Sequence, residues 1–176
     1  ITPHGLAYAW DLDEVWQARP AFARGRTSPT TVAHHLGVQR LRLAAAAAGW
    51  TDWTAARFLL GQGLAKIPDA EAVTPEGLRV AIEFEREIKT TKRYQAILGA
   101  YLVALKVGRW QQVVYVCPTA ALAARLHRVL YSLGHVTYAG QAAALVPTRH
   151  LDQRILCMGL EAWPPLAVHA AGQEEV

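Results

Sequence analysis

Apolar positions recur at helical spacing between residues 29 and 48, directly after a typical helix start. Ser28 can cap the first turn, and Pro29 has the backbone angle that the first helical position needs. We predict a helix that runs to Ala48 and stops at Gly49, with polar positions His35, Gln39 and Arg42 on the side next to its core face. The core face is expected to consist of four residues: Val32, Leu36, Leu43 and Ala47.

A shorter helix and a pair of strands are expected next. Thr51 is a candidate cap for a helix that contains Trp53 and Phe58, and two glycines then end it. The strand that begins near Asp69 is followed by the turn sequence 74–77 and by a β-branched, apolar run at 78–82. A short turn of this kind joins adjacent strands, so we predict an antiparallel hairpin.

The second half of the chain alternates helical and extended patterns. A further helix is expected after the hairpin, and the residues at helical spacing that should face the core are Tyr94, Ile97, Leu98, Tyr101 and Leu105. A strand at 113–117, a helix from Thr119 to Leu133 and a last strand at 154–158 complete the order α-β-β-α-β-α-β. The fold class expected is therefore α/β, a mixed sheet flanked by helices, over residues 27–160 with a tail at 161–176.

Three carboxylates are expected at one end of the hairpin. Glu83 and Glu85 leave the apolar strand on the same face, with Phe84 turned the other way, and Asp69 belongs to the neighbouring strand. Clustered carboxylates repel each other and are costly to bury unless a cation shares the space. An all-oxygen cluster suits Mg²⁺ or Mn²⁺, so we predict a metal site here.

The arrangement of Pro68-Asp69 and Glu83-Phe84-Glu85 resembles the PD-(D/E)xK nuclease superfamily. In that superfamily the third element is usually lysine, a position occupied here by Glu85. The resemblance implies a restriction-endonuclease-like core and metal-assisted phosphodiester cleavage by Asp69, Glu83 and Glu85. Lys89, expected in the first turn of the next helix, could supply the missing cation.

A longer match covers roughly residues 30 to 130. The segments 31–42 and 82–94, together with Trp53, resemble the replication-relaxation family, which includes MobC-type plasmid mobilisation proteins that act on DNA at transfer origins. The resemblance implies a relaxase-like endonuclease that nicks DNA during conjugation, with other transfer-complex proteins as possible partners. It also implies that His35 contacts phosphate or supports a site residue; the alternative is a hydrogen-bonded structural histidine on the flank of the helix. Lys92 and Arg93, with Arg42, are the further candidates for contacts to the DNA backbone.

Composition sets broad limits. A net charge of +4 permits a nucleic-acid partner without demanding one, and no apolar run reaches the roughly 20 residues of a membrane span. Two cysteines, Cys117 and Cys157, lie in apolar strings and suit a reducing cytoplasm as core residues. The opening residues 1–9 have the turn pattern of a winged-helix strand, so 1–26 is interpreted as the end of an upstream DNA-binding domain and a linker.

Two other functions stay open at this point. The chain could be a DNA-binding accessory factor that keeps a nuclease fold without cleavage, which the glutamate at position 85 favours. It could also be a regulatory or interaction domain whose carboxylates are merely solvated at the rim of a hairpin.

Overall fold

The structure is a computed structural model in which residues 28–165 are described. The expectations for residues 1–26 and most of the tail lie outside this range. No helix within residues 28–165 is long and apolar enough to cross a membrane. The elements, in chain order, are α2 (Pro29–Ala47), β1 (Thr51–Ala55), α3 (Ala56–Leu59), β2 (Ala70–Val73), β3 (Arg79–Phe84), α4 (Thr91–Lys106), β4 (Gln112–Cys117), α5 (Ala120–Tyr131), β5 (His135–Tyr138), β6 (Gln141–Ala144), α6 (Pro147–His150), β7 (Ile155–Gly159) and the 3-10 helix η1 (Leu160–Ala162).

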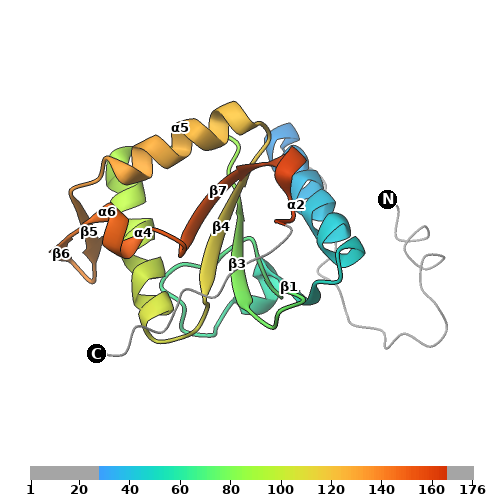
Figure 1. Cartoon of the computed structure of the whole chain (residues 1–176), viewed down its shortest axis with the longest axis horizontal. Coiled ribbons are helices and arrows are strands. Elements are labelled where there is room, and N and C mark those ends of the chain that lie inside the picture. The colour runs from blue at the N-terminus through green and yellow to red at the C-terminus, as the bar shows by residue number, and fades with distance from the viewer. Residues whose placement is uncertain (1–27, 166–176) are drawn as a thin grey trace.

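Five strands form one mixed sheet in the order β1-β2-β3-β4-β7 (Figure 1). β1, β2 and β3 are antiparallel neighbours, whereas β3, β4 and β7 are parallel. The expected hairpin is confirmed: β2 and β3 pair through a turn in which Gly77 N–H donates to Thr74 O at 2.9 Å. The class expected from the sequence, α/β with helices flanking a mixed sheet, is confirmed at this level.

The sheet separates two cores. On one face α4 and α5 pack over alternate residues of the parallel strands, such as Ala81, Tyr115 and Cys117. On the other face α2 packs over the residues between them, such as Ile82 and Val114. The expected core face of α4 is confirmed, because Tyr94, Leu98 and Tyr101 are buried and the two other predicted residues pack against the same core.

Ser28 caps α2 as expected, accepting from Thr31 N–H at 3.1 Å, but the predicted core face of this helix is wrong. The buried residues are Gly37, Val38, Leu41 and Ala45. The reason is close packing: a Cβ on Gly37 would lie only 1.9 Å from a ring carbon of Phe84. The helix therefore comes closest to the sheet at Gly37 and buries Val38 and Leu41, while Val32, Leu36 and Leu43 stay exposed.

The helix expected at Trp53 is also wrong. Thr51–Ala55 is a strand, and only Ala56–Leu59, which includes Phe58, is helical. β1 pairs with β2 with a register shift between Thr51 and Thr54, where Asp52 has a φ of 52°. Pairing with a neighbouring strand therefore decides the conformation here, and the capping signal of Thr51 does not.

The C-terminal half contains elements that the sequence pattern did not predict. Thr119 caps α5 as expected, accepting from Leu122 N–H at 3.2 Å, but the helix ends at Tyr131, two residues before the predicted end. The β5–β6 hairpin then packs on α4. This contact needs Gly99, where a Cβ would lie 2.3 Å from Thr137 O. Trp163, within the predicted tail, is buried, and its indole N–H donates to Leu41 O at 3.0 Å.

Candidate functional site

A cleft of about 480 Å³ lies at the end of the β2–β3 hairpin, between the first turns of α2 and the segment that leads into α4. One position beyond the pair Ala70–Ile82, Asp69 stands opposite Glu83 in the antiparallel register. Both carboxylates line the cleft, as does Glu85. The structure thus brings together the three acids that the sequence pattern singled out.

Asp69 is held by two hydrogen bonds. Its Oδ1 lies 3.1 Å from His34 Nε2, and its Oδ2 accepts from Phe84 N–H at 2.8 Å. Burial opposes ionisation of Asp69, but the bonds from His34 and Phe84 outweigh it and hold the pKa of Asp69 below its ordinary value. The same hydrogen bond with Asp69 raises the pKa of His34 despite its partial burial.

Glu83 is buried and bonded to two side chains. Its Oε1 accepts from the ammonium of Lys66 and from the hydroxyl of Tyr101, and Lys66 also lies over the Tyr101 ring, 5.6 Å from its centroid. Burial raises the pKa of Glu83 above its ordinary value, although the Lys66 charge opposes the shift. Burial likewise raises the pKa of Tyr101, and the Glu83 charge adds to this shift.

Glu85 has a similar pair of neighbours. Its Oε2 accepts from the ammonium of Lys89, which lies 5.9 Å from the ring centroid of Tyr94, and the Tyr94 hydroxyl also interacts with Glu85. Lys89 was expected inside the helix, but α4 begins at Thr91 with Thr90 as its cap. The Lys89 N–H instead donates to the Tyr94 hydroxyl at 3.2 Å, which fixes the segment before the helix. Its ammonium does point to the carboxylates, as predicted.

The two glutamates therefore form two Lys–Glu–Tyr units side by side. Glu83 and Glu85 are two residues apart on one strand face, and their tyrosines are seven residues apart, or about two turns, on one face of α4. Residues two apart on one face of the strand thus interact with residues seven apart on one face of the helix. Each unit buries a carboxylate with a lysine cation and a nearby tyrosine hydroxyl, which helps to make a buried charge tolerable.

The acidic and imidazole side chains that line the cleft are four carboxylates and the two histidines His34 and His35. Among residues 28–165, no group of three or more His, Cys, Asp and Glu side chains is positioned to hold a metal ion. Both Asp69 oxygens accept hydrogen bonds, and each glutamate is bonded to a lysine. Asp69 and Glu83 are the two acids that come from adjacent strands and face one another.

The candidate DNA contacts are spread more widely. Arg93 and His35 line the cleft, whereas Lys92 and Arg42 are exposed side chains elsewhere on their helices. Arg86, which was not among the candidates, also lines the cleft and donates to Thr30 O at 2.8 Å. Arg86 and Arg93 form what we call the basic rim of the cleft, and they come from the end of β3 and the start of α4.

Besides Arg86, three residues of the site were missed from the sequence: His34, Lys66 and Tyr101. His35 was selected in place of His34, but a one-residue step rotates a helix position by about 100°. Lys66 lies in a segment without regular structure, where no periodicity gives a direction. Tyr101 was identified as a core residue, and a signal was present in its spacing of seven from Tyr94.

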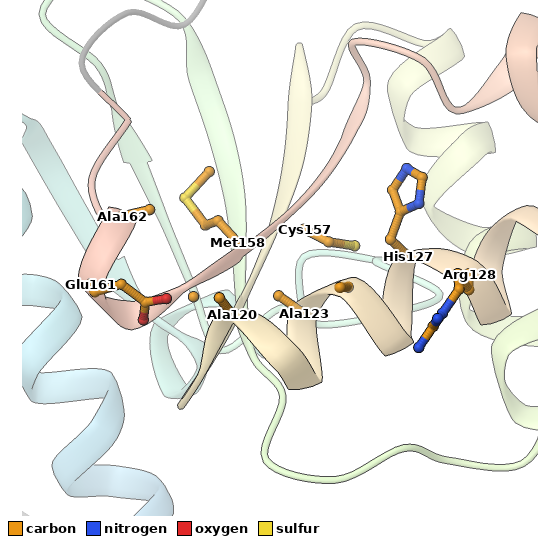
Figure 2. Close-up of a pocket in the computed structure, with 10 residues that line it drawn as sticks. Ala120, Ala123, His127, Arg128, Cys157, Met158, Glu161 and Ala162 are labelled. Atoms are coloured by element: carbon orange, nitrogen blue, oxygen red, sulfur yellow. The ribbon is translucent and has the colours of Figure 1, made fainter.

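A second cavity of about 460 Å³ lies between α5 and β7 (Figure 2). Alanines of α5 form much of its wall, with Glu161 at one end and Arg128 at the other. His127, also on this wall, stacks on Tyr131 with ring centroids 4.0 Å apart. None of the carboxylates predicted from the sequence lines this cavity, so the carboxylate cleft is the candidate site.

Comparisons with known proteins give no independent assignment. No family model matches the chain, and neither the curated proteins nor the solved structures contain a match to it. The functional argument therefore depends on the residues and geometry of the cleft.

Proposed function

We propose that this chain is a metal-dependent DNA endonuclease domain with a restriction-endonuclease-like core. It would nick or relax DNA at the transfer origin of a plasmid or integrative element, in the cytoplasm and with other transfer proteins. The observation that carries the proposal is that Asp69, Glu83 and Glu85, from a hairpin and the residue beyond it, line one cleft together with Lys66 and Lys89.

The donor set fits Mg²⁺ or Mn²⁺ as a site with two protein carboxylates. Mg²⁺ commonly binds one or two carboxylates and completes its shell with water and substrate phosphate. Asp69 and Glu83 would hold the ion, and Glu85 would complete its shell or act as general base; each glutamate also accepts from a lysine. When bound, the ion would polarise the scissile phosphate and lower the pKa of a water molecule that attacks it.

The remaining residues of the cleft have roles that follow from their contacts. The His34 and Phe84 hydrogen bonds keep Asp69 ionised and oriented, and the Tyr101 hydroxyl orients Glu83. Lys66 and Lys89 provide positive charge that can stabilise the charge developing on phosphate oxygens. Arg93, at the rim, would contact the DNA backbone, with Lys92 one position before it.

A DNA-binding accessory factor without cleavage is the second candidate. It is favoured by the lack of a three-ligand metal group within residues 28–165 and by the lysine bonded to each glutamate. In this case the basic rim would bind DNA, and the carboxylates would stabilise the cleft.

The deciding experiment is relaxation of a supercoiled plasmid that carries the cognate transfer origin, using the full-length protein with Mg²⁺ or Mn²⁺. We expect nicked circles that disappear when the metal is chelated. The Glu83→Ala variant should lose nicking and keep DNA binding, and Glu76→Ala, in the exposed hairpin turn, is the matched control. Unchanged nicking by Glu83→Ala would refute the proposal, and binding without nicking by the natural protein would favour the accessory factor.

DNA binding is tested separately from chemistry. Replacing Lys92 and Arg93 together with alanine should weaken duplex binding about equally for all sequences and reduce the salt slope by up to about 2. Arg125 and Arg128, exposed on α5, provide a matched double-alanine control. Equal binding by both double variants would show that the α4 cations do not contact DNA.

A further inference from the structure

The two edges of the main sheet differ in how they are protected. β1 forms one edge, and its register shift and the positive φ of Asp52 are features that keep a further strand from pairing with it. β7 forms the other edge and pairs only with β4 among residues 28–165. Its register with β4 is unbroken, and its five residues include no charge and no proline. Such an edge is a template for another strand.

The direction of the backbone groups of β7 follows from its hydrogen bonds. Val113 N–H donates to Arg154 O at 2.8 Å, which turns the backbone at position 154 toward β4. Backbone groups alternate in direction along a strand. Cys157 and Gly159, like Ile155 at an odd position, therefore turn their N–H and C=O groups toward the free edge.

The cavity between α5 and β7 lies along this edge (Figure 2). Cys157 and Met158 point to opposite faces of the sheet, and a cavity that is lined by both must pass the free edge of the strand. The other wall of the cavity is one side of α5, next to the buried face of that helix. The exposed residues of this wall, at helical spacing, are Ala120, Ala124, His127 and Arg128. The wall thus has small side chains in its first half and large ones in its second half.

The two ends of the cavity carry opposite charges. Glu161 lies at the end where α5 begins, beside Ala120, and Arg128 lies at the other end (Figure 2). The Glu161 carboxylate lies against the last residue of β7, because a Cβ on Gly159 would be 2.3 Å from its Oε1. Within residues 28–165, neither Glu161 nor Arg128 forms an ion pair.

We propose that this edge binds a second copy of the chain, with β7 pairing antiparallel to β7 of that copy about a two-fold axis at Cys157. In a two-fold interface each residue of one copy meets its counterpart's neighbour in the other copy reciprocally, so the surface must be complementary to itself. The wall of α5 meets this condition in size, because the alanines of one copy face His127 and Arg128 of the other.

The same axis also pairs the charges. Ala124 is four residues from Ala120 and from Arg128, about 6 Å along the helix. Cys157 is two residues from Gly159, about 7 Å along the strand. An axis at Cys157 therefore passes near Ala124 and brings Arg128 of each copy to the Glu161 end of the other. The two ion pairs at the ends and the strand pairing at the centre form one continuous interface.

The dimer does not depend on the proposed cleavage. β3, β4 and β7 are parallel, so their carboxyl ends point in one direction within a copy. Antiparallel pairing of β7 turns the second copy around. The two carboxylate clefts then lie at opposite ends of one continuous sheet, and each cleft acts alone.

The test is the mass of the full 176-residue chain in light scattering, with the dissociation constant of the dimer from analytical ultracentrifugation. At about 100 µM we expect twice the chain mass of 19.3 kDa. Arg128→Glu and Glu161→Arg should each raise the dissociation constant at least about tenfold, because like charges then meet at both ends. The double variant restores the pair in reverse and should return the constant to within about threefold of the natural value. Arg125→Glu, the same change on another side of α5, is the matched control.

Hydrogen–deuterium exchange in peptides that cover residues 154–160 tests the strand pairing. The amides of Cys157 and Gly159 should exchange at least about tenfold more slowly in the dimer than in the monomeric Arg128→Glu variant. The substituted residues are exposed, so the variants should retain the melting temperature of the natural chain.

Each other outcome overturns the proposal. A chain that stays monomeric at about 100 µM has no such interface. If these β7 amides are nevertheless protected in that monomer, another segment of the same chain covers the edge. A dimer that is unaffected by both charge reversals, or that the double variant does not restore, uses another surface. Equal exchange of the β7 amides in monomer and dimer would exclude strand pairing.

Discussion

Two buried tyrosines allow the hydrogen bonding of the cleft to be measured directly. Tyr101 and Tyr115 are both fully or almost fully buried, and their rings form a T-shaped pair with centroids 6.4 Å apart. The Tyr101 hydroxyl donates to Glu83. The Tyr115 hydroxyl is buried without a hydrogen-bond partner among residues 28–165. Replacing each tyrosine with phenylalanine therefore removes the same atom from two different environments.

The two substitutions should have opposite effects on the free energy of unfolding. Tyr101→Phe removes a hydrogen bond to a buried carboxylate, a loss of about 1.5–3 kcal/mol. Tyr115→Phe removes a hydroxyl whose desolvation is uncompensated, so the change should be neutral or stabilising, up to about 1–3 kcal/mol. For a chain of this size, 1 kcal/mol corresponds to a shift in Tm of roughly 2–4 °C.

Urea unfolding followed by circular dichroism measures this difference at neutral pH. The two variants should have equal m-values, because the surface exposed on unfolding is almost the same, and should differ in their midpoints. The double variant reports whether the neighbouring rings are coupled. If Tyr115→Phe destabilises the protein as much as Tyr101→Phe, the assignment of Tyr101 as a specific donor to Glu83 is refuted.

Two other predictions test the packing around the sheet. Gly37→Ala should destabilise the protein by about 1–3 kcal/mol in thermal unfolding, because the added Cβ overlaps the Phe84 ring. Gly134→Ala, with open space around the added Cβ, is the control and should be neutral. Equal Tm values for the two variants would contradict the close approach of α2 to the sheet. Burial raises the pKa of Cys117 and of Cys157 to about 12, so both thiols should react with iodoacetamide at pH 8 roughly a thousandfold more slowly than a free cysteine. Rapid alkylation of Cys117, which is the fully buried thiol of the two, would contradict this prediction.

Sequence periodicity predicted the elements whose conformation follows from their own residues. The Ser28 and Thr119 caps, the turn before β3 and the buried face of α4 all depend on local signals, and the structure contains each of them. Glu83 and Glu85 share a cleft because a strand period of two leaves no other choice. These features depend little on the rest of the chain.

The wrong predictions concern elements whose conformation or buried side depends on contacts with residues distant in the sequence. α2 has apolar residues on two opposite sides, so its own period does not identify the side that meets the sheet. The choice depends on Phe84, which accepts only a glycine at position 37. Trp53 lies in a strand because the segment 51–55 pairs with β2. Trp163 is buried and donates to Leu41 O, which is 122 residues earlier in the chain. No local pattern contains these partners.

The charges that line the cleft explain how a glutamate can occupy position 85, where the PD-(D/E)xK pattern usually has lysine. Four acidic and four basic side chains line the cleft, apart from its two histidines. Glu85 removes the positive charge of the usual lysine, but Lys89, four residues later, bonds to Glu85 and supplies a positive charge. A balanced cleft attracts neither a free cation nor a free phosphate strongly, since Glu83 and Glu85 are each already paired with a lysine. In the proposed function, metal and DNA would therefore enter as complementary charges, the cation toward Asp69 and Glu83 and the phosphate toward the lysines and the arginine rim.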